Sequence, residues 1–146
     1  MKLAFYKAPG TWMDRAIRAW MRGPYSHVEL VVGDAPWGST CFAASNREGA
    51  VRLKTMVLDA DTWDIVDLGS DGEAEARQWF LDRIGAKYDW IGILGFIFRP
   101  IRGSPSRYFC SEAVAAALGF AEPWRMDPNQ LHAVALKMTE LKVGKS

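Results

Sequence analysis

Apolar and polar positions alternate with a period of two through much of the first half of the chain, which is typical of strands. Residues 2 to 7, KLAFYK, predict a short strand that stops at Pro9-Gly10. Residues 26 to 33, SHVELVVG, predict a second strand with Val28, Leu30 and Val32 on one side and His27, Glu29 and Val31 on the other. Three more strands are predicted over 39 to 44, 50 to 56 and 62 to 68.

Four other segments have the patterns expected of helices. After Thr11, a candidate N-cap, apolar residues recur at helical spacing until Gly23-Pro24, with three arginines on the polar side. Ser70 and Glu73 have the spacing of a capping box and predict a helix of about four turns that ends at Gly85. The remaining two helices are predicted from the alanine-rich run that follows Cys110 and from Asp127-Pro128 through Met138.

The segment AKYDWIGILGFIF, 86 to 98, is interrupted by glycine, and its apolar content favours a short buried helix. A helix, several meandering strands and then helices predict an α+β fold, with a small antiparallel sheet packed against helices. The 146 residues suit one domain, 1 to 146, without a linker or internal repeat.

Composition narrows the function classes. A net charge of +1 gives no support for nucleic-acid binding, which usually needs a concentrated basic face. With no visible export signal we expect a cytoplasmic protein whose two cysteines are reduced, with delivery by a phage or secretion system left open. The two histidines and two cysteines lack the close spacings of metal ligands, and no phosphate-binding loop is present, so we expect no metal and no cofactor.

Cys110 is the candidate nucleophile. It stands where an apolar strand end becomes a helix, and the unpaired N–H groups at a helix N-terminus stabilise a thiolate, the reactive form of cysteine. A buried packing residue is the competing interpretation, because free cysteines are among the most buried residue types. The nucleophile hypothesis therefore requires a base elsewhere in the chain.

A general base for Cys110 must be one of two histidines. His132 falls inside the last predicted helix and suits a packed or surface position. His27 begins a strand and shares a face with Glu29, a carboxylate that can hold the imidazole in one tautomer. Ser45 and Asn46, which follow the next strand, are the alternative orienting residues.

Four patches in order, PYSHVELVV, IGAKYDWIG, YFCSEAV and DPNQL, resemble the circularly permuted branch of the papain-like NlpC peptidase superfamily, which includes relatives of lecithin retinol acyltransferase. In that branch the histidine strand precedes the cysteine helix, as it does here. The resemblance implies a papain-like fold of permuted topology with Cys110 as nucleophile and His27 as base. It also assigns Tyr88, in the family's Gly-x-x-Tyr patch, to the wall of the site.

One position departs from the family pattern. Many relatives place a polar orienting residue in the strand after the histidine, where this chain reads CFAASN, so Glu29 or Ser45 must take that role. The family mechanism implies cleavage of an amide, such as that of a peptide or cell-wall stem peptide, through a thioester. Two other functions stay open: a lipid acyl hydrolase or acyltransferase with membrane-surface contact, and a catalytically silent binding module of a phage or secretion assembly. The sequence does not give the oligomeric state.

Overall fold

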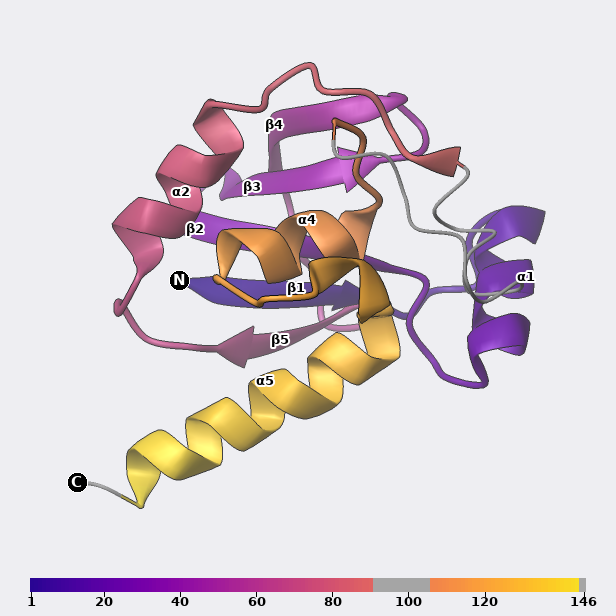
Figure 1. Ribbon diagram of the computed structural model, residues 1–146. Coiled ribbons are helices and arrows are strands. Elements are labelled where there is room, and N and C mark those ends of the chain that lie inside the picture. The colour runs from indigo at the N-terminus through magenta and orange to yellow at the C-terminus, as the bar shows by residue number, and fades with distance from the viewer. Residues whose placement is uncertain (91–105, 145–146) are drawn as a thin grey trace.

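Five strands make one antiparallel sheet in the computed structural model, which describes residues 1–90 and 106–144 (Figure 1). The order across the sheet is β4-β3-β2-β1-β5. The strands are β1 (Lys2–Tyr6), β2 (His27–Ala35), β3 (Gly38–Ser45), β4 (Ala50–Met56) and β5 (Trp63–Asp67). Each of the five predicted strands is therefore present. Burial does not alternate along β1, β2 and β3, where buried residues follow one another, because both faces of the sheet carry apolar clusters. The α+β class is confirmed.

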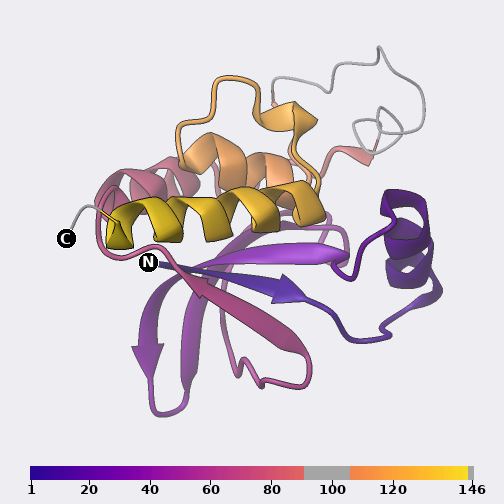
Figure 2. The same cartoon turned by 90° about the horizontal axis from the view of Figure 1, so that it is seen from below.

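Helices cover one face of this sheet, and within the described residues the other face carries no helical layer (Figure 2). The described part of the chain holds α1 (Trp12–Met21), α2 (Glu73–Leu81), α4 (Cys110–Ala117) and α5 (Pro128–Val143), with a short 3-10 helix, η1 (Pro123–Arg125). Of these, α2, α4 and α5 lie over the sheet, whereas α1 stands at its end (Figure 1). No described helix has both the length and the apolar character needed to cross a membrane.

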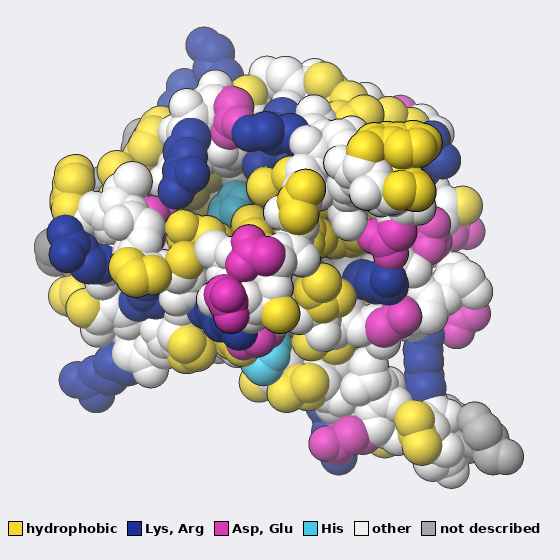
Figure 3. All heavy atoms as spheres, turned by 180° about the vertical axis from the view of Figure 1, so that it is seen from behind, with side chains coloured by type: hydrophobic (Ala, Val, Ile, Leu, Met, Phe, Trp, Pro, Cys, Tyr) yellow, Lys and Arg dark blue, Asp and Glu magenta, His cyan; other side chains and the backbone are white. Residues whose placement is uncertain are grey.

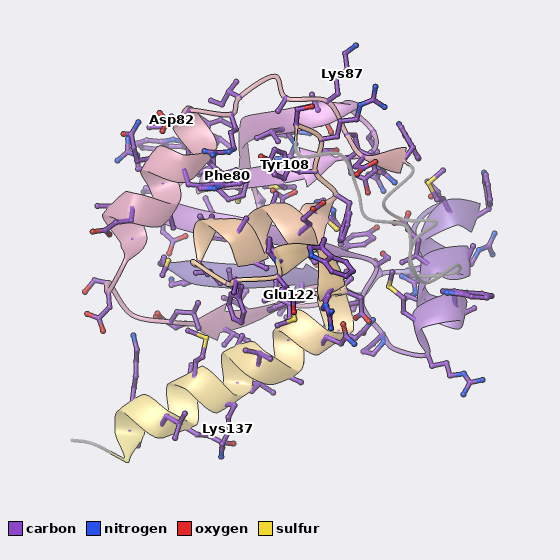
Figure 4. The ribbon with its side chains drawn as sticks, viewed as in Figure 1. Phe80, Asp82, Lys87, Tyr108, Glu122 and Lys137 are labelled. Atoms are coloured by element: carbon purple, nitrogen blue, oxygen red, sulfur yellow. The ribbon has the colours of Figure 1, made fainter. Side chains whose placement is uncertain are left out.

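The larger core lies between the sheet and the helices. Leu3, Phe5, Val28 and Leu30 contribute to it from β1 and β2. Figure 4 shows Phe80 pointing from α2 toward the sheet, where its ring stacks on Phe42 at 5.4 Å. The opposite face carries a smaller apolar cluster, which consists of Ala4, Val31, Cys41 and Trp63.

Helix boundaries differ from the prediction where a distant group intervenes. Thr11 caps α1 as predicted and forms a capping box with Asp14. The capping box predicted for Ser70 and Glu73 is wrong, because the Glu73 carboxylate pairs with the ammonium of Met1 at 2.6 Å and Gly72 occupies the N-cap. Helix α2 also ends at Leu81, before the predicted stop at Gly85.

The buried helix predicted over 86 to 98 falls mostly outside the described residues. Its first part is extended: Lys87 bridges to Ala50 in β4, and Tyr88 bridges to Tyr108 just before α4. These bridges fix Tyr88 beside the N-terminus of α4.

Candidate active site

Cys110 is the first residue of α4. The preceding Phe109 is extended, with φ −97° and ψ 170°, and the first intrahelical hydrogen bond runs from the Ala113 N–H to the Phe109 carbonyl at 3.0 Å. The N–H groups of Cys110 and Ser111 therefore have no acceptor within the helix. Such groups stabilise negative charge on the sulfur or on an oxyanion beside it. The predicted placement of Cys110 at a helix N-terminus is confirmed.

His27, the first residue of β2, meets Cys110 although 82 residues separate them in sequence. Burial alone would lower the pKa of His27, but negative charge on the Cys110 sulfur and a hydrogen bond to it raise that pKa, and Glu29 adds to the effect, to about 10. The imidazole is therefore cationic at neutral pH. This is the arrangement in which a thiolate and an imidazolium stabilise each other.

Glu29 holds the imidazole from the far side. Its Oε1 lies 2.8 Å from His27 Nε2, which leaves Nδ1 as the ring nitrogen available for proton transfer with the sulfur. Burial would raise the pKa of this fully buried carboxyl, but the contacts with His27 and Arg52 lower it. Glu29 is thus an ionised carboxylate in the position of the third member of a triad.

Arg52 of β4 completes the chain of contacts, and the sequence interpretation missed it. Its Nη1 and Nη2 donate to the two Glu29 oxygens at 3.0 and 2.5 Å. The two Cα atoms belong to strands on either side of β3 and are therefore about 10 Å apart. Ala43 lies directly opposite Arg52 in the register of β3 and β4, and its methyl group leaves the guanidinium room to pass. The alanine that departs from the family pattern has a structural role here.

A pocket opens beside the imidazole on the face of the sheet that the helices leave uncovered. Tyr6, Trp63 and Met56 contribute apolar surface to it, and His27 contributes its ring. The volume is about 550 Å³, including open solvent at the mouth. Figure 3, which views the molecule from behind, shows a hollow on this side bordered by basic side chains. Cys110 is not one of the described residues that line the pocket, and its exposed fraction is 5%.

Tyr88 lines the same pocket and lies close to the sulfur. Burial raises the pKa of its hydroxyl well above the ordinary value, and the charge on Cys110 adds to the rise. The phenol therefore stays protonated and can donate a hydrogen bond to a substrate oxygen.

The other candidates take different places. Ser45 lines the pocket, but its hydroxyl donates to Glu48 rather than to His27. Asn46 donates to the sulfur of Met13 at 3.2 Å. His132 is packed as predicted, with its ring 4.8 Å from that of Phe5 and 4.5 Å from that of Tyr25. The structure therefore brings Glu29, and not Ser45, to the imidazole.

Both cysteines are free thiols within the described residues. Cys41 lies on β3 at 0% exposure, where burial, with the charge of Glu29, raises its pKa to about 12. It has no histidine partner among the described contacts. Across residues 1–90 and 106–144, no group of three or more His, Cys, Asp or Glu side chains is placed to hold a metal ion.

Comparisons with known proteins do not identify the family. No protein-family model matches the chain. A search of curated proteins also finds no match. The interpretation of the site therefore depends on its own geometry.

Proposed function

We propose that this protein is a cysteine hydrolase that cleaves an amide bond through a thioester intermediate, on a papain-like scaffold of permuted topology. The observation that carries the proposal is the continuous set of contacts from Cys110 through His27 and Glu29 to Arg52. A packing cysteine has no need of an imidazolium held in place by a buried ion pair. The histidine-first order of the resembling family agrees with the order of these residues.

In the proposed reaction the same groups act in both steps, the formation of the thioester and its hydrolysis. The Cys110 thiolate attacks the amide carbon, and the N–H groups of the first turn of α4 together with the Tyr88 hydroxyl stabilise the oxyanion. His27 gives its proton to the leaving nitrogen as the C–N bond breaks, which leaves a thioester on the sulfur. Water then attacks the thioester, His27 accepts its proton, and the C–S bond breaks to release the acid and restore the thiolate. Glu29 keeps the ring in place throughout.

A catalytically silent binding module is the second candidate, and the low exposure of Cys110 favours it. Alkylation with iodoacetamide near pH 6, followed by peptide mass mapping, separates the two functions. A live site predicts that Cys110 reacts much faster than Cys41, whose raised pKa keeps it a thiol, and that His27→Ala removes the difference. Equal, slow labelling of both cysteines would support the binding module.

Substrate trials then distinguish amide from acyl-ester chemistry. Peptidoglycan stem-peptide fragments and fatty acyl esters are supplied separately to the wild-type protein and to Cys110→Ala. A product that forms only from peptide, and only with Cys110 present, supports the amidase. If only fatty acid is released, and only when Cys110 is present, the result would instead support a lipid acyl hydrolase.

A further inference from the structure

The pocket beside His27 has two unlike sides, which follow from the order of the strands. His27 belongs to β2, and the sheet continues through β1 and β5 on one side of it and through β3 and β4 on the other. Tyr6 and Trp63 line the first side, where they are opposite one another in the register of β1 and β5, with their rings packed edge to face at 5.1 Å. Arg47, in the turn between β3 and β4, and Lys54 of β4 line the second side. The imidazole therefore lies between an aromatic side and a cationic side.

The two cations reach solvent and keep most of their hydrogen-bond donors. The side chain of Arg47 is 62% exposed and that of Lys54 is 53% exposed. Among the described residues, the guanidinium of Arg47 has one polar contact, through a single nitrogen to Asp14 at 3.5 Å. The ammonium of Lys54 lies 3.7 Å from Glu48, beyond hydrogen-bond distance. Since each of these cations carries several N–H donors, both can bind a further acceptor.

The carboxylates of the same pocket already have donors. Asp14 and Glu29 are buried, and each accepts hydrogen bonds from more than one described side chain. Glu48 is partly exposed, but it accepts from the Ser45 hydroxyl and lies 3.5 Å from Arg52 Nε. Burial would raise the pKa of each of these carboxyls, but the hydrogen bonds and the nearby cations lower it, so all three are ionised. An entering ligand therefore meets unused donors rather than unused acceptors, which favours an anion over an amine.

We propose that this pocket binds a carboxylate that is attached to an aromatic or aliphatic group. The carboxylate lies at Arg47 and Lys54, because a planar guanidinium can donate two parallel hydrogen bonds to its oxygens. The apolar group packs against the aromatic side of the pocket. A phosphate fits less well: each arginine and lysine of the pocket lies 3.7 Å or less from a carboxylate, so a second negative charge would meet little uncompensated positive charge.

The substrate class that follows is an amide with an acidic group. This assignment rests on the function proposed above, in which Cys110 cleaves the amide. The carboxylate group of the substrate would enter the pocket beside His27, on the side where basic side chains border the hollow (Figure 3). Binding of the carboxylate itself does not require turnover and is measured separately.

NMR titration of the isotope-labelled full chain tests the pocket, with the indole N–H of Trp63 as the reporter. Phenylpropionate carries the carboxylate, phenylpropanol replaces it with a neutral hydroxyl, and phenylethylphosphonate replaces it with a phosphonate. Arg47→Gln/Lys54→Gln removes the two cations. Arg77→Gln/Lys137→Gln is the matched control, because it removes the same charges from exposed positions on α2 and α5, away from the pocket. Circular dichroism and thermal unfolding verify that each variant is folded.

The proposal expects phenylpropionate to bind roughly tenfold more tightly than phenylpropanol, since each exposed charge contact changes an affinity by at most about fivefold. Arg47→Gln/Lys54→Gln should lose most of this preference, and Arg77→Gln/Lys137→Gln should keep it. Equal binding of the acid and the alcohol, or a preference that the folded Arg47→Gln/Lys54→Gln protein retains, would overturn the proposal. Tighter binding of the phosphonate than of the carboxylate would overturn it as well and assign the pocket to a phosphate.

Alkylation of Cys110 separates this proposal from the hydrolase. At about ten times its dissociation constant, phenylpropionate should slow the reaction of Cys110 with iodoacetamide by roughly tenfold, because few pockets remain empty. If Cys110 reacts quickly and bound phenylpropionate does not slow it, the pocket does not hold the substrate and the assignment of a substrate class is wrong. If Cys110 is unreactive without any ligand, the hydrolase is wrong, and the assignment of a substrate class is wrong with it. Carboxylate binding measured at Trp63 would then support a ligand pocket of a binding module.

Discussion

Replacing Arg52 with alanine tests the buried ion pair that supports the candidate site. The side chain of Glu29 is 1% exposed and that of Arg52 is 14% exposed, and both Glu29 oxygens receive guanidinium hydrogen bonds. Removing one partner from a buried ion pair costs about 3–5 kcal/mol, since the remaining charge stays without compensation. Water that enters the space of the lost guanidinium, and the neighbouring imidazolium, both lessen this cost. We therefore expect a loss of about 3 kcal/mol.

Urea denaturation at pH 7 measures this loss as a change in the free energy of unfolding. Lys54→Ala is the control: Lys54 lies two residues along the same strand, is 53% exposed and pairs with Glu48 at 3.7 Å. It should cost less than about 1 kcal/mol, as exposed pairs do. Combining Arg52→Ala with Glu29→Gln should cost no more than Arg52→Ala alone, because the side chain that Arg52→Ala leaves without its guanidinium is then neutral.

The reasoning is wrong if Arg52→Ala costs less than about 1 kcal/mol or no more than Lys54→Ala. The same variant should also slow the alkylation of Cys110, because an unrestrained Glu29 no longer holds the ring of His27. Unchanged alkylation together with a large loss of stability would restrict Arg52 to a role in folding.

Three further outcomes follow from the same contacts. Ala43→Leu places a larger side chain between Glu29 and Arg52 and should cost about 1–3 kcal/mol in urea while slowing Cys110 alkylation. Tyr88→Phe should lower turnover of a cleaved substrate by roughly 10- to 100-fold but leave alkylation, which forms no oxyanion, unchanged. Burial raises the pKa of Glu112 to about 7. The hydrogen bond from the Phe109 N–H opposes this rise, and the negative charge of Asp89 adds to it. The folded state therefore favours its protonated form, so its contribution to stability is complete below pH 4.5, is lost as the pH rises through 7, and amounts to at most about 3 kcal/mol. Glu112→Gln should remove that slope in denaturation curves recorded from pH 4.5 to 8.

The parts of the site that local sequence patterns could predict are those that depend on one element. The period of two places His27 and Glu29 on one face of β2, and the alanine run after Cys110 specifies a helix that begins there. The choice between Glu29 and Ser45 could not be made in this way, because it depends on the direction of side chains from two strands. Only the 2.8 Å contact with His27 decides it.

Arg52 could not be predicted because it acts across an intervening strand. Its distance from Glu29 depends on the register of β3 against both neighbours, including the irregularity between Val31 and Gly33. The small residue was the useful signal. An alanine on the same face of the sheet as a buried carboxylate leaves space for a cationic side chain from the next strand. The start of α2 was mispredicted for a similar reason, since the Met1 ammonium that binds Glu73 is distant in sequence.

The contact between His27 and Cys110 depends on where their elements begin. By alternation, His27 faces away from the layer of helices to which Cys110 belongs, so the two groups meet only around the end of the sheet. The chain that enters β2 is fixed there from both sides. Asn129 of α5 exchanges hydrogen bonds of 3.0 and 3.1 Å with the backbone of Tyr25, and a Cβ at Gly23 would lie 2.2 Å from its Oδ1. Since the Ser26 hydroxyl also donates to Asp14 of α1, contacts made by α1 and by α5 together set the position of the imidazole.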